Sequence, residues 1–270
     1  MKESIFNCMN KIQDFITVNG KQLYYEMINL DFRATDKPFL VFLHEGLGST
    51  EQWRDFPVLL SNMIQCPAII YDRYGYGKSE MFAEARTKTY SNDEAFIFLP
   101  ELIEKLHIAE KLILIGHSDG GTISLLYASK FPKKVLAIIT EADHLFCEEI
   151  TTKGIKNAVK EYEQGTLKEI LYKFHKEKTD SVFHGWSDVW LSEEGKEWNV
   201  EEYLPMITSP VLAIQGKDDI YGSVEQLISK LKNINSSVEV LFIANCGHIP
   251  HYQAKNTVIN KMSSFISSVL

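Results

Sequence analysis

Three residues of this chain have the side chains of an acyl-transfer centre, and each stands at a short turn. Ser118 is the middle residue of the sequence GHSDG, Asp219 ends the sequence GKDD, and His248 ends the sequence CGH. A serine hydroxyl is a weak nucleophile, so it needs a base that takes its proton and a carboxylate that orients this base. The order serine, acid, base differs from that of two older types of serine protease. We predict that Ser118 is the nucleophile, His248 its general base and Asp219 the acid.

The turn at Ser118 is predicted to connect a strand to a helix. Residues 112–115 are all apolar and run directly into GHSDG, as expected of a buried strand. Ile123, Leu126 and Tyr127 follow at the spacing of a helix with one apolar face. A serine held clear of the backbone requires a strained turn, and glycines on both sides of it avoid clashes with the strand and the helix.

The rest of the chain alternates between segments with the patterns of strands and helices. A hairpin comes first, because Asn19-Gly20 favours a tight turn. The alternation predicts the α/β class, with a mostly parallel central sheet flanked by helices and functional residues at the carboxyl ends of its strands. The predicted strands are residues 14–18, 21–28, 39–43, 67–71, 111–115, 135–140, 210–214 and 238–243. The predicted helices are residues 51–62, 90–106 with a kink or break at Pro100, 122–130, 224–231 and 257–269.

One segment, residues 145–205, does not continue this alternation. It is charged and helical in tendency, and it contains three tryptophans, Trp186, Trp190 and Trp198. We predict that it is a helical cap inserted after the sixth strand, on an α/β core formed by residues 1–144 and 206–270. Phe183 and the first two tryptophans are candidates for the wall of a substrate pocket, although the same cluster is as well suited to the core between the cap helices.

Composition limits the compartment and the partners. The chain has 270 residues, of which 45% are hydrophobic and 24% charged, as in an ordinary globular protein. Its net charge of -8 disfavours nucleic acid and anionic membranes as partners. No run of about 18 apolar residues is present, and residues 1–14 lack the apolar run of a signal peptide. We expect a cytoplasmic protein with a small-molecule substrate. Its cysteines, which show no C-x-x-C spacing, are expected to be separate thiols: Cys8, Cys66, Cys147 and Cys246.

Five motifs resemble those of the α/β-hydrolase superfamily, in the same order and over nearly the whole chain. They are the oxyanion loop HEG at 44–46, the segment DRYGYGKS at 72–79, the nucleophile elbow GHSDG at 116–120, the acid loop GKDD at 216–219 and the base loop CGH at 246–248. The resemblance implies the α/β-hydrolase fold and a structural role for residues 72–79.

The resemblance also implies an oxyanion hole made by the backbone N–H groups of Asp119 and Gly46. Glu45 stands where the superfamily commonly has glycine, which leaves the second donor open. Asp143 is an alternative acid, because it ends the strand after the elbow and some members of the superfamily take their acid from that position.

A serine hydrolase of esterase type is the function that this resemblance implies. We expect cleavage of a small carboxylic ester or thioester through an acyl-enzyme, without a cofactor or metal ion. Hydrolysis of a carbon–carbon or amide bond is the alternative, because the same triad serves relatives with those activities. A non-catalytic ligand-binding protein fits less well, because all three triad residue types are present. Four histidines without metal-ligand spacing are expected to be solvated or locally bonded: His144, His175, His184 and His251.

Overall fold

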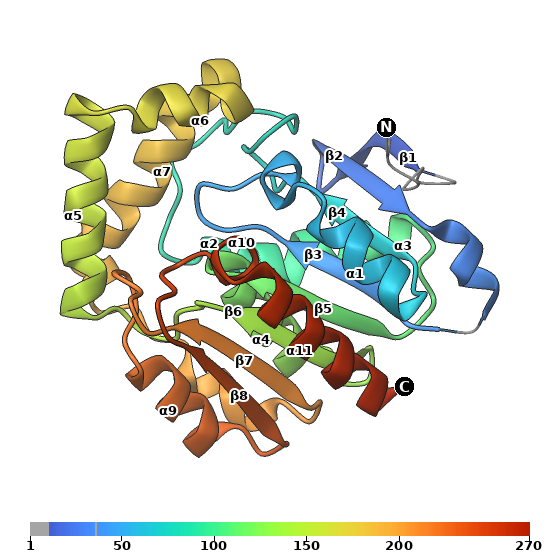
Figure 1. Cartoon of the computed structure of the whole chain (residues 1–270). Coiled ribbons are helices and arrows are strands. Elements are labelled where there is room, and N and C mark those ends of the chain that lie inside the picture. Colours follow the sequence, from blue (N-terminus) through green and yellow to red (C-terminus); the bar gives the residue numbers. More distant parts are fainter. Residues whose placement is uncertain (1–10, 36) are drawn as a thin grey trace, which may run out of the picture.

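A central sheet of eight strands organises the structure, a computed structural model that describes residues 11–35 and 37–270 (Figure 1). The strand order is β1-β2-β4-β3-β5-β6-β7-β8. β2 pairs antiparallel with β1 and β4, and all other neighbours are parallel, which confirms the predicted mostly parallel sheet. The strands are β1 Ile12–Val18, β2 Lys21–Ile28, β3 Phe39–Leu43, β4 Ala68–Tyr71, β5 Leu112–His117, β6 Val135–Glu141, β7 Val211–Gly216 and β8 Val238–Ile243.

The turn between β1 and β2 forms at the predicted dipeptide. Asn19 and Gly20 have φ angles of 48° and 72°, and Val18 pairs with Lys21 across the two-residue loop. Positive φ at both central residues matches the right-handed twist of the two strands, which is why asparagine and glycine are favoured there. The hairpin is therefore encoded locally.

Helices cover both faces of the sheet (Figure 1). Side chains alternate along each strand, so Leu40 and Phe42 face one layer, while Val41 and Leu43 face the other. The first layer contains α1 Phe56–Ile64 and α11 Lys255–Val269, and the second contains α3 Leu99–Lys105 and α4 Asp119–Lys130. Further helices of the core include η1 Leu30–Thr35, α9 Glu225–Asn233 beside β8, and α10 Pro250–Gln253.

Two predicted helices are interrupted. The segment 51–62 divides into η2 Thr50–Trp53 and α1, because Pro57 lacks an N–H group and is tolerated only in the first turn of a helix. The segment 90–106 forms α2 Tyr90–Asp93, the π-helical turn η3 Glu94–Phe98 and then α3. Pro100 lies in the first turn of α3, directly after the π-helical turn, so the regular α-helical pattern is interrupted just before this proline while the chain stays helical.

The segment between β6 and β7 is helical and stands over the carboxyl ends of the strands (Figure 1). It contains α5 Glu149–Gln164, α6 Leu167–His175, η4 Lys176–Lys178, α7 Thr179–Leu191, α8 Glu193–Lys196 and η5 Glu201–Met206. α5, α6 and α7 pack on one another around a small apolar core, whereas η5 packs against α4. We call residues 149–196 the cap helices below.

Two further findings concern the chain as a whole. Cys66, Cys147 and Cys246 are free thiols, and Cys8 lies outside the described residues. Within the described ranges, no helix has the length and apolar character needed to cross a membrane.

Candidate active site

Ser118 occupies a strained turn between β5 and α4. Its φ and ψ angles are 52° and -119°, a conformation that is costly for a residue with a side chain. A Cβ atom on Gly116 would lie 2.1 Å from the carbonyl oxygen of Gly120, and one on Gly120 would lie 1.9 Å from that of Leu43. Only glycine fits at both positions, which is the local reason for the GHSDG sequence.

The three residues of the predicted triad meet at this turn. Nε2 of His248 lies 3.1 Å from Oγ of Ser118, and Nδ1 lies 3.0 and 2.9 Å from the two carboxylate oxygens of Asp219. Asp219 also accepts hydrogen bonds from the backbone N–H of Tyr221 and from Nε2 of Gln215. Because Asp219 is an acceptor, Nδ1 of His248 carries the proton and Nε2 is free to accept the Ser118 proton.

Burial and charge have opposite effects on the pKa values of this pair. Burial lowers the pKa of His248, but the Asp219 carboxylate more than compensates, so the pKa lies above its ordinary value. Burial would raise the pKa of Asp219, but His248 and the Tyr221 N–H group hold it below its ordinary value. The arrangement therefore favours an anionic Asp219 and stabilises the imidazolium form of His248.

The alternative acid, Asp143, has a different partner. Its Oδ1 lies 2.9 Å from Nζ of Lys230 on α9, and both side chains are almost completely buried. Among the described residues, no hydrogen bond or ion pair joins Asp143 to His248. Asp219 is thus the carboxylate that contacts the histidine, and Asp143 neutralises a buried lysine.

The side chain of Asp119, the residue after Ser118, is buried. Its Oδ1 accepts a hydrogen bond from the Tyr90 hydroxyl at 2.8 Å, and Trp190 Nε1 donates to that hydroxyl at 3.1 Å. Its Oδ2 lies 3.5 Å from Nη2 of Arg73 and 3.9 Å from Nη2 of Arg86. These contacts fix the first turn of α4, whose backbone N–H was predicted as an oxyanion donor.

Sequence reasoning missed Tyr90, Arg73 and Arg86. They are separated from Ser118 along the chain, and no spacing rule connects them with it. The motif DRYGYGKS, which contains Arg73, was the only available signal.

His44 and Arg73 form hydrogen bonds with the loop that follows β3. Nδ1 of His44 donates to the carbonyl oxygen of Glu45 at 2.8 Å, Nε2 accepts the backbone N–H of Arg73 at 3.1 Å, and the guanidinium of Arg73 donates to the Glu45 carbonyl at 2.6 Å. Gly46 is so close to the cap that a Cβ atom there would lie 2.6 Å from Cδ1 of Trp186 and 3.2 Å from Oδ2 of Asp119. The two predicted oxyanion residues, Gly46 and Asp119, are therefore neighbours.

The segment at residues 72–79 is a rigid turn. The carboxylate of Asp72 accepts hydrogen bonds from the backbone N–H groups of Thr50 at 2.6 Å and Lys78 at 2.8 Å. Gly77 has a φ of +45°, and a Cβ atom there would lie 2.1 Å from the Asp72 carboxylate. Ser79 donates from Oγ to the Asp72 carbonyl at 2.5 Å. These contacts are all with the segment itself or with Thr50 of the core, as expected of a structural motif.

A cavity of about 280 Å³ lies between the cap helices and the triad. Ser118 and His248 are at its base, with Trp186 and Trp190 in its wall. Aliphatic side chains from the cap line much of the remainder: Ile155, Ala158, Leu167, Ile170 and Leu171. The cavity therefore offers an apolar surface for a small substrate directly above the serine.

Phe183 does not line this cavity, so its prediction as a pocket residue is wrong. Its side chain is fully buried, and its ring stacks on Tyr162 with a centroid distance of 3.7 Å and an interplanar angle of 6°. Phe183 thus fills the interface between α7 and α5, whereas the two tryptophans of α7 reach the cavity.

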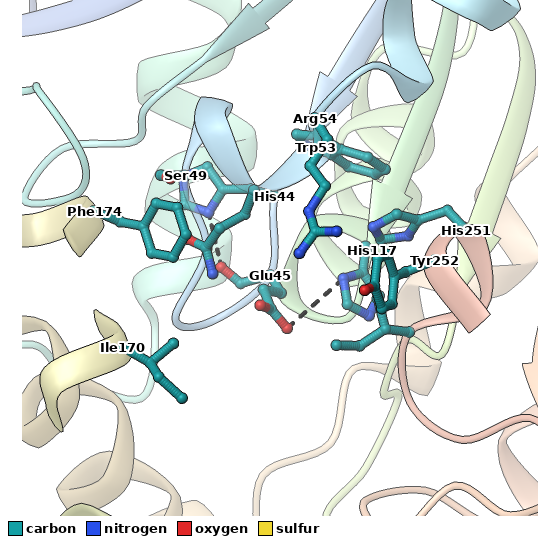
Figure 2. A pocket seen from close by; sticks show the side chains of 13 residues that line it. His44, Glu45, Ser49, Trp53, Arg54, His117, Ile170, Phe174, His251 and Tyr252 are labelled. Carbon is teal, nitrogen blue, oxygen red and sulfur yellow. Dashed lines mark hydrogen bonds and ion pairs between the residues drawn. The ribbon is translucent and has the colours of Figure 1, made fainter. Parts of the chain in front are cut away.

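A second cavity of about 250 Å³ adjoins the first, and Figure 2 shows the residues around it. Both cavities include Glu45, Gln52, Ile170 and Ile249 in their walls. His117, the last residue of β5, lines the second cavity together with Arg54. Glu45 therefore stands at the junction of the two cavities.

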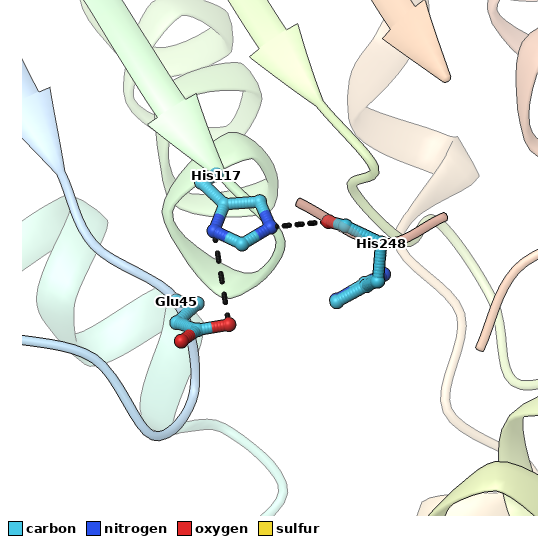
Figure 3. A group of neighbouring side chains, drawn as sticks. All are labelled: Glu45, His117 and His248. Atoms are coloured by element: carbon cyan, nitrogen blue, oxygen red, sulfur yellow. Dashed lines mark hydrogen bonds and ion pairs between the residues drawn. The ribbon is translucent and has the colours of Figure 1, made fainter. Parts of the chain in front are cut away.

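Glu45, His117 and His248 each direct one potential metal-ligand atom to a common region, with these atoms within 4.8 Å of one another (Figure 3). Nε2 of His117 lies 2.6 Å from the carbonyl oxygen of His248, and Nδ1 lies 3.7 Å from Oε2 of Glu45. Both ring nitrogens of His248 already contact Asp219 and Ser118. A metal ion bound to these residues would compete with the triad.

The remaining histidines have local partners or are exposed. His184 is exposed, whereas His144 is buried and lies 3.1 Å from the carbonyl oxygen of Tyr221 through Nε2. His175 connects the cap to the core: its Nδ1 accepts the Gly77 N–H at 3.1 Å, and its Nε2 donates to the Leu47 carbonyl at 2.9 Å.

Glu141, at the end of β6, contacts segments on both sides of the triad. Its backbone carbonyl accepts the N–H of Ser118 at 2.8 Å. Its buried carboxylate accepts hydrogen bonds from the backbone N–H and from Nδ1 of His251, both at 2.9 Å. His251 lies in α10, just after His248. One glutamate therefore holds the elbow and the segment that carries the base.

Comparisons with known proteins agree with this architecture. A family model described as the alpha/beta hydrolase fold matches residues 38–153. A proline iminopeptidase from Saccharolobus solfataricus is 25% identical, with 97% of this chain and 94% of that protein covered. Lipase 3 from Moraxella sp. is also 25% identical, with coverage of 91% and 81%.

A solved structure shows the same fold. A serine hydrolase involved in carbazole degradation is 20% identical and superimposes with a TM-score of 0.74, over 96% of this chain and 99% of that chain. The strand order, the helical layers and the matching family model together show that this chain has the α/β-hydrolase fold.

Proposed function

We propose that this chain is a serine hydrolase that cleaves a small carboxylic ester or thioester through an acyl-enzyme. The contact of His248 with both Ser118 and Asp219 is the observation that carries the proposal. A strained, glycine-flanked serine with a histidine at hydrogen-bond distance is the arrangement that acyl transfer requires. The apolar cavity above Ser118 supports a small acyl substrate.

In the first half of the reaction, Nε2 of His248 takes the hydroxyl proton of Ser118 while Oγ bonds to the substrate carbonyl carbon. The oxyanion that forms receives hydrogen bonds from the backbone N–H groups of Asp119 and Gly46, and such donors contribute about 3 kcal/mol each to the transition state. The imidazolium, stabilised by Asp219, then gives its proton to the departing alcohol or thiol. The acyl group remains on Ser118.

In the second half, water replaces the leaving group. His248 takes a proton from the water as its oxygen attacks the acyl carbon, and the tetrahedral intermediate collapses to release the acid. Ser118 recovers its proton from His248. The proposed reaction requires neither a cofactor nor a metal ion. We further propose that the protein acts in the cytoplasm on a small molecule and that neither nucleic acid nor a membrane is its partner.

Covalent labelling by a fluorophosphonate tests the nucleophile. We expect one adduct, on Ser118, and none in a Ser118→Ala variant that retains its far-UV circular dichroism. If the folded protein is not labelled, the serine hydrolase proposal is wrong. The non-catalytic alternative predicts this negative result.

The bond that is cleaved requires a separate test. The relative named as a proline iminopeptidase favours an amide as the second candidate, and the relative named as a lipase favours an ester. We expect turnover of short p-nitrophenyl esters and thioesters, with kcat/KM falling once the acyl chain exceeds the cavity. A higher kcat/KM for prolyl amides than for every ester would support the second candidate, and turnover only of a carbon–carbon substrate would support the other alternative.

A further inference from the structure

We propose that Glu45 makes this site selective for esters with a positively charged group beside the reacting carbonyl. The inference rests on the proposed hydrolase function and adds a substrate class to it. Glu45 follows β3 in the oxyanion loop, and its side chain is 22% exposed. It lines the cavity that contains Ser118. It also lines the adjoining cavity (Figure 2). Its side chain therefore borders both spaces.

Among the described residues that line the Ser118 cavity, Glu45 is the acidic side chain that has no lysine or arginine beside it. Lysine and arginine are absent from the described residues that line this cavity, and its acidic residues are Glu45 and Asp119. Asp119 already accepts a hydrogen bond from Tyr90 and lies beside Arg73 and Arg86. No described lysine or arginine nitrogen lies within 4.0 Å of the Glu45 carboxylate.

Arg54, in the wall of the adjoining cavity, has another contact. Its guanidinium lies over the ring of Tyr252, 4.3 Å from the ring centroid. The side of Glu45 that faces Ser118 therefore has no lysine or arginine of the described chain as its partner.

His117 does not act as the missing cation. Its Nε2 donates to the carbonyl oxygen of His248, so Nδ1 presents a lone pair to Oε2 of Glu45 at 3.7 Å (Figure 3). Burial lowers the pKa of His117 to about 4, which keeps the ring neutral near neutral pH. Two acceptors thus face each other, and a cationic group of the substrate would be attracted to both.

Aromatic side chains in the same cavity favour the same class of substrate. Trp186, Trp190 and Tyr221 line it together with Glu45. Aromatic faces attract ammonium groups, most strongly where water is excluded. A carboxylate group on the substrate, in contrast, would meet Glu45 without a compensating lysine or arginine.

A matched pair of esters isolates the charge. Acetylcholine and 3,3-dimethylbutyl acetate have nearly the same shape, but the first has a quaternary nitrogen where the second has carbon. We expect kcat/KM to be about tenfold higher for acetylcholine, as for one charge pair in a partly solvated site. In Glu45→Gln, the ratio should approach one. If the Glu45 charge changes the reactivity of His248, it does so for both esters, and the change cancels in the ratio of their kcat/KM values.

A surface glutamate supplies the control. Glu193→Gln removes the same charge from a side chain that is 90% exposed on α8, so the ratio should stay at the wild-type value. Raising the salt concentration should reduce the preference of the wild-type protein, because mobile ions screen exposed charge. Equal kcat/KM values for the two esters in the wild-type protein, or an unchanged preference in Glu45→Gln, would overturn the proposal.

Binding separates this inference from the proposed reaction. Tryptophan fluorescence of the Ser118→Ala variant can report choline and 3,3-dimethylbutan-1-ol, because Trp186 and Trp190 line the cavity. Tighter binding of choline that is lost with Glu45→Gln supports charge selection even if neither ester is hydrolysed. Equal binding of the two alcohols contradicts it even if both esters are hydrolysed.

Discussion

The Tyr90 hydroxyl donates a hydrogen bond over 2.8 Å to Oδ1 of Asp119, the residue that follows the proposed nucleophile. The same hydroxyl accepts a hydrogen bond from Trp190 of the cap. One phenol therefore connects the cap, α2 and the first residue of α4. We expect the position of the Asp119 backbone N–H, the proposed oxyanion donor, to depend on this connection.

Replacing Tyr90 by phenylalanine should destabilise the protein without opening a cavity. The carboxylate of Asp119 would lose a buried donor, and such a loss costs about 1–3 kcal/mol in the free energy of unfolding. Urea unfolding measures the change. Tyr172→Phe is the matched control, because Tyr172 is 50% exposed, and its effect should stay within about 0.5 kcal/mol. Equal free energies of unfolding for the two variants would contradict this role of Tyr90.

Substitution by asparagine should have different effects at the two carboxylates near the elbow, Asp219 and Asp143. Asp219→Asn should lower kcat by about 10⁴-fold, because an asparagine does not hold the required tautomer of the histidine. Asp143→Asn should instead lower the free energy of unfolding by about 3–5 kcal/mol, because Lys230 would be a buried charge without its partner.

Fluorophosphonate labelling and thermal unfolding measure these two effects. The double variant Asp143→Asn/Lys230→Met should recover much of the stability, since it removes the second charge as well. A loss of labelling in folded Asp143→Asn, with labelling retained in Asp219→Asn, would reverse the assignment of the acid.

The pH dependence of kcat/KM should report the raised pKa of His248. Catalysis requires the neutral imidazole, so activity should fall as the pH decreases through a midpoint above 6.5. In Asp219→Asn the imidazolium loses its main stabilising charge, and the midpoint should move to lower pH. Kinetics give the wild-type value, and NMR titration of the His248 ring gives the value of the slow variant. A lower pKa in the wild-type protein than in Asp219→Asn would contradict this electrostatic account.

His175 should hold the cap to the core. In His175→Ala, the backbone N–H of Gly77 loses its acceptor and the carbonyl oxygen of Leu47 loses its donor. Hydrogen exchange of residues 74–79 should become faster, while β5 and β6 remain protected. The control is His184→Ala, which removes an exposed histidine from α7. Equal exchange of this segment in the two variants would show that His175 does not hold it.

Most of the fold could be predicted because its signals are local. The Asn19-Gly20 turn requires positive φ angles, and the apolar run before Ser118 belongs to a strand buried on both faces. Ser118, Asp219 and His248 follow strands whose carboxyl ends meet at one edge of the sheet, so their proximity follows from the topology.

The remaining features depend on contacts between distant segments. The surface of α7 that contains Phe183 meets Tyr162 on α5, and no periodicity in either helix reveals which aromatic ring turns inward. Asp143 is recognisable as a possible acid, but its pairing with Lys230 depends on the packing of α9. The position of Glu45 in the HEG motif is visible in the sequence, whereas its lack of a lysine or arginine partner among the described residues depends on the three-dimensional structure.

The two contacts of Glu141 have a consequence for thermal motion in the site. The N–H of Ser118 is hydrogen-bonded to the backbone carbonyl of Glu141. His251, in the segment after His248, is hydrogen-bonded to the Glu141 carboxylate. A displacement of the end of β6 therefore carries both partners in the same direction. The 3.1 Å separation between Ser118 and His248 should vary less during such fluctuations than the position of either residue relative to the sheet.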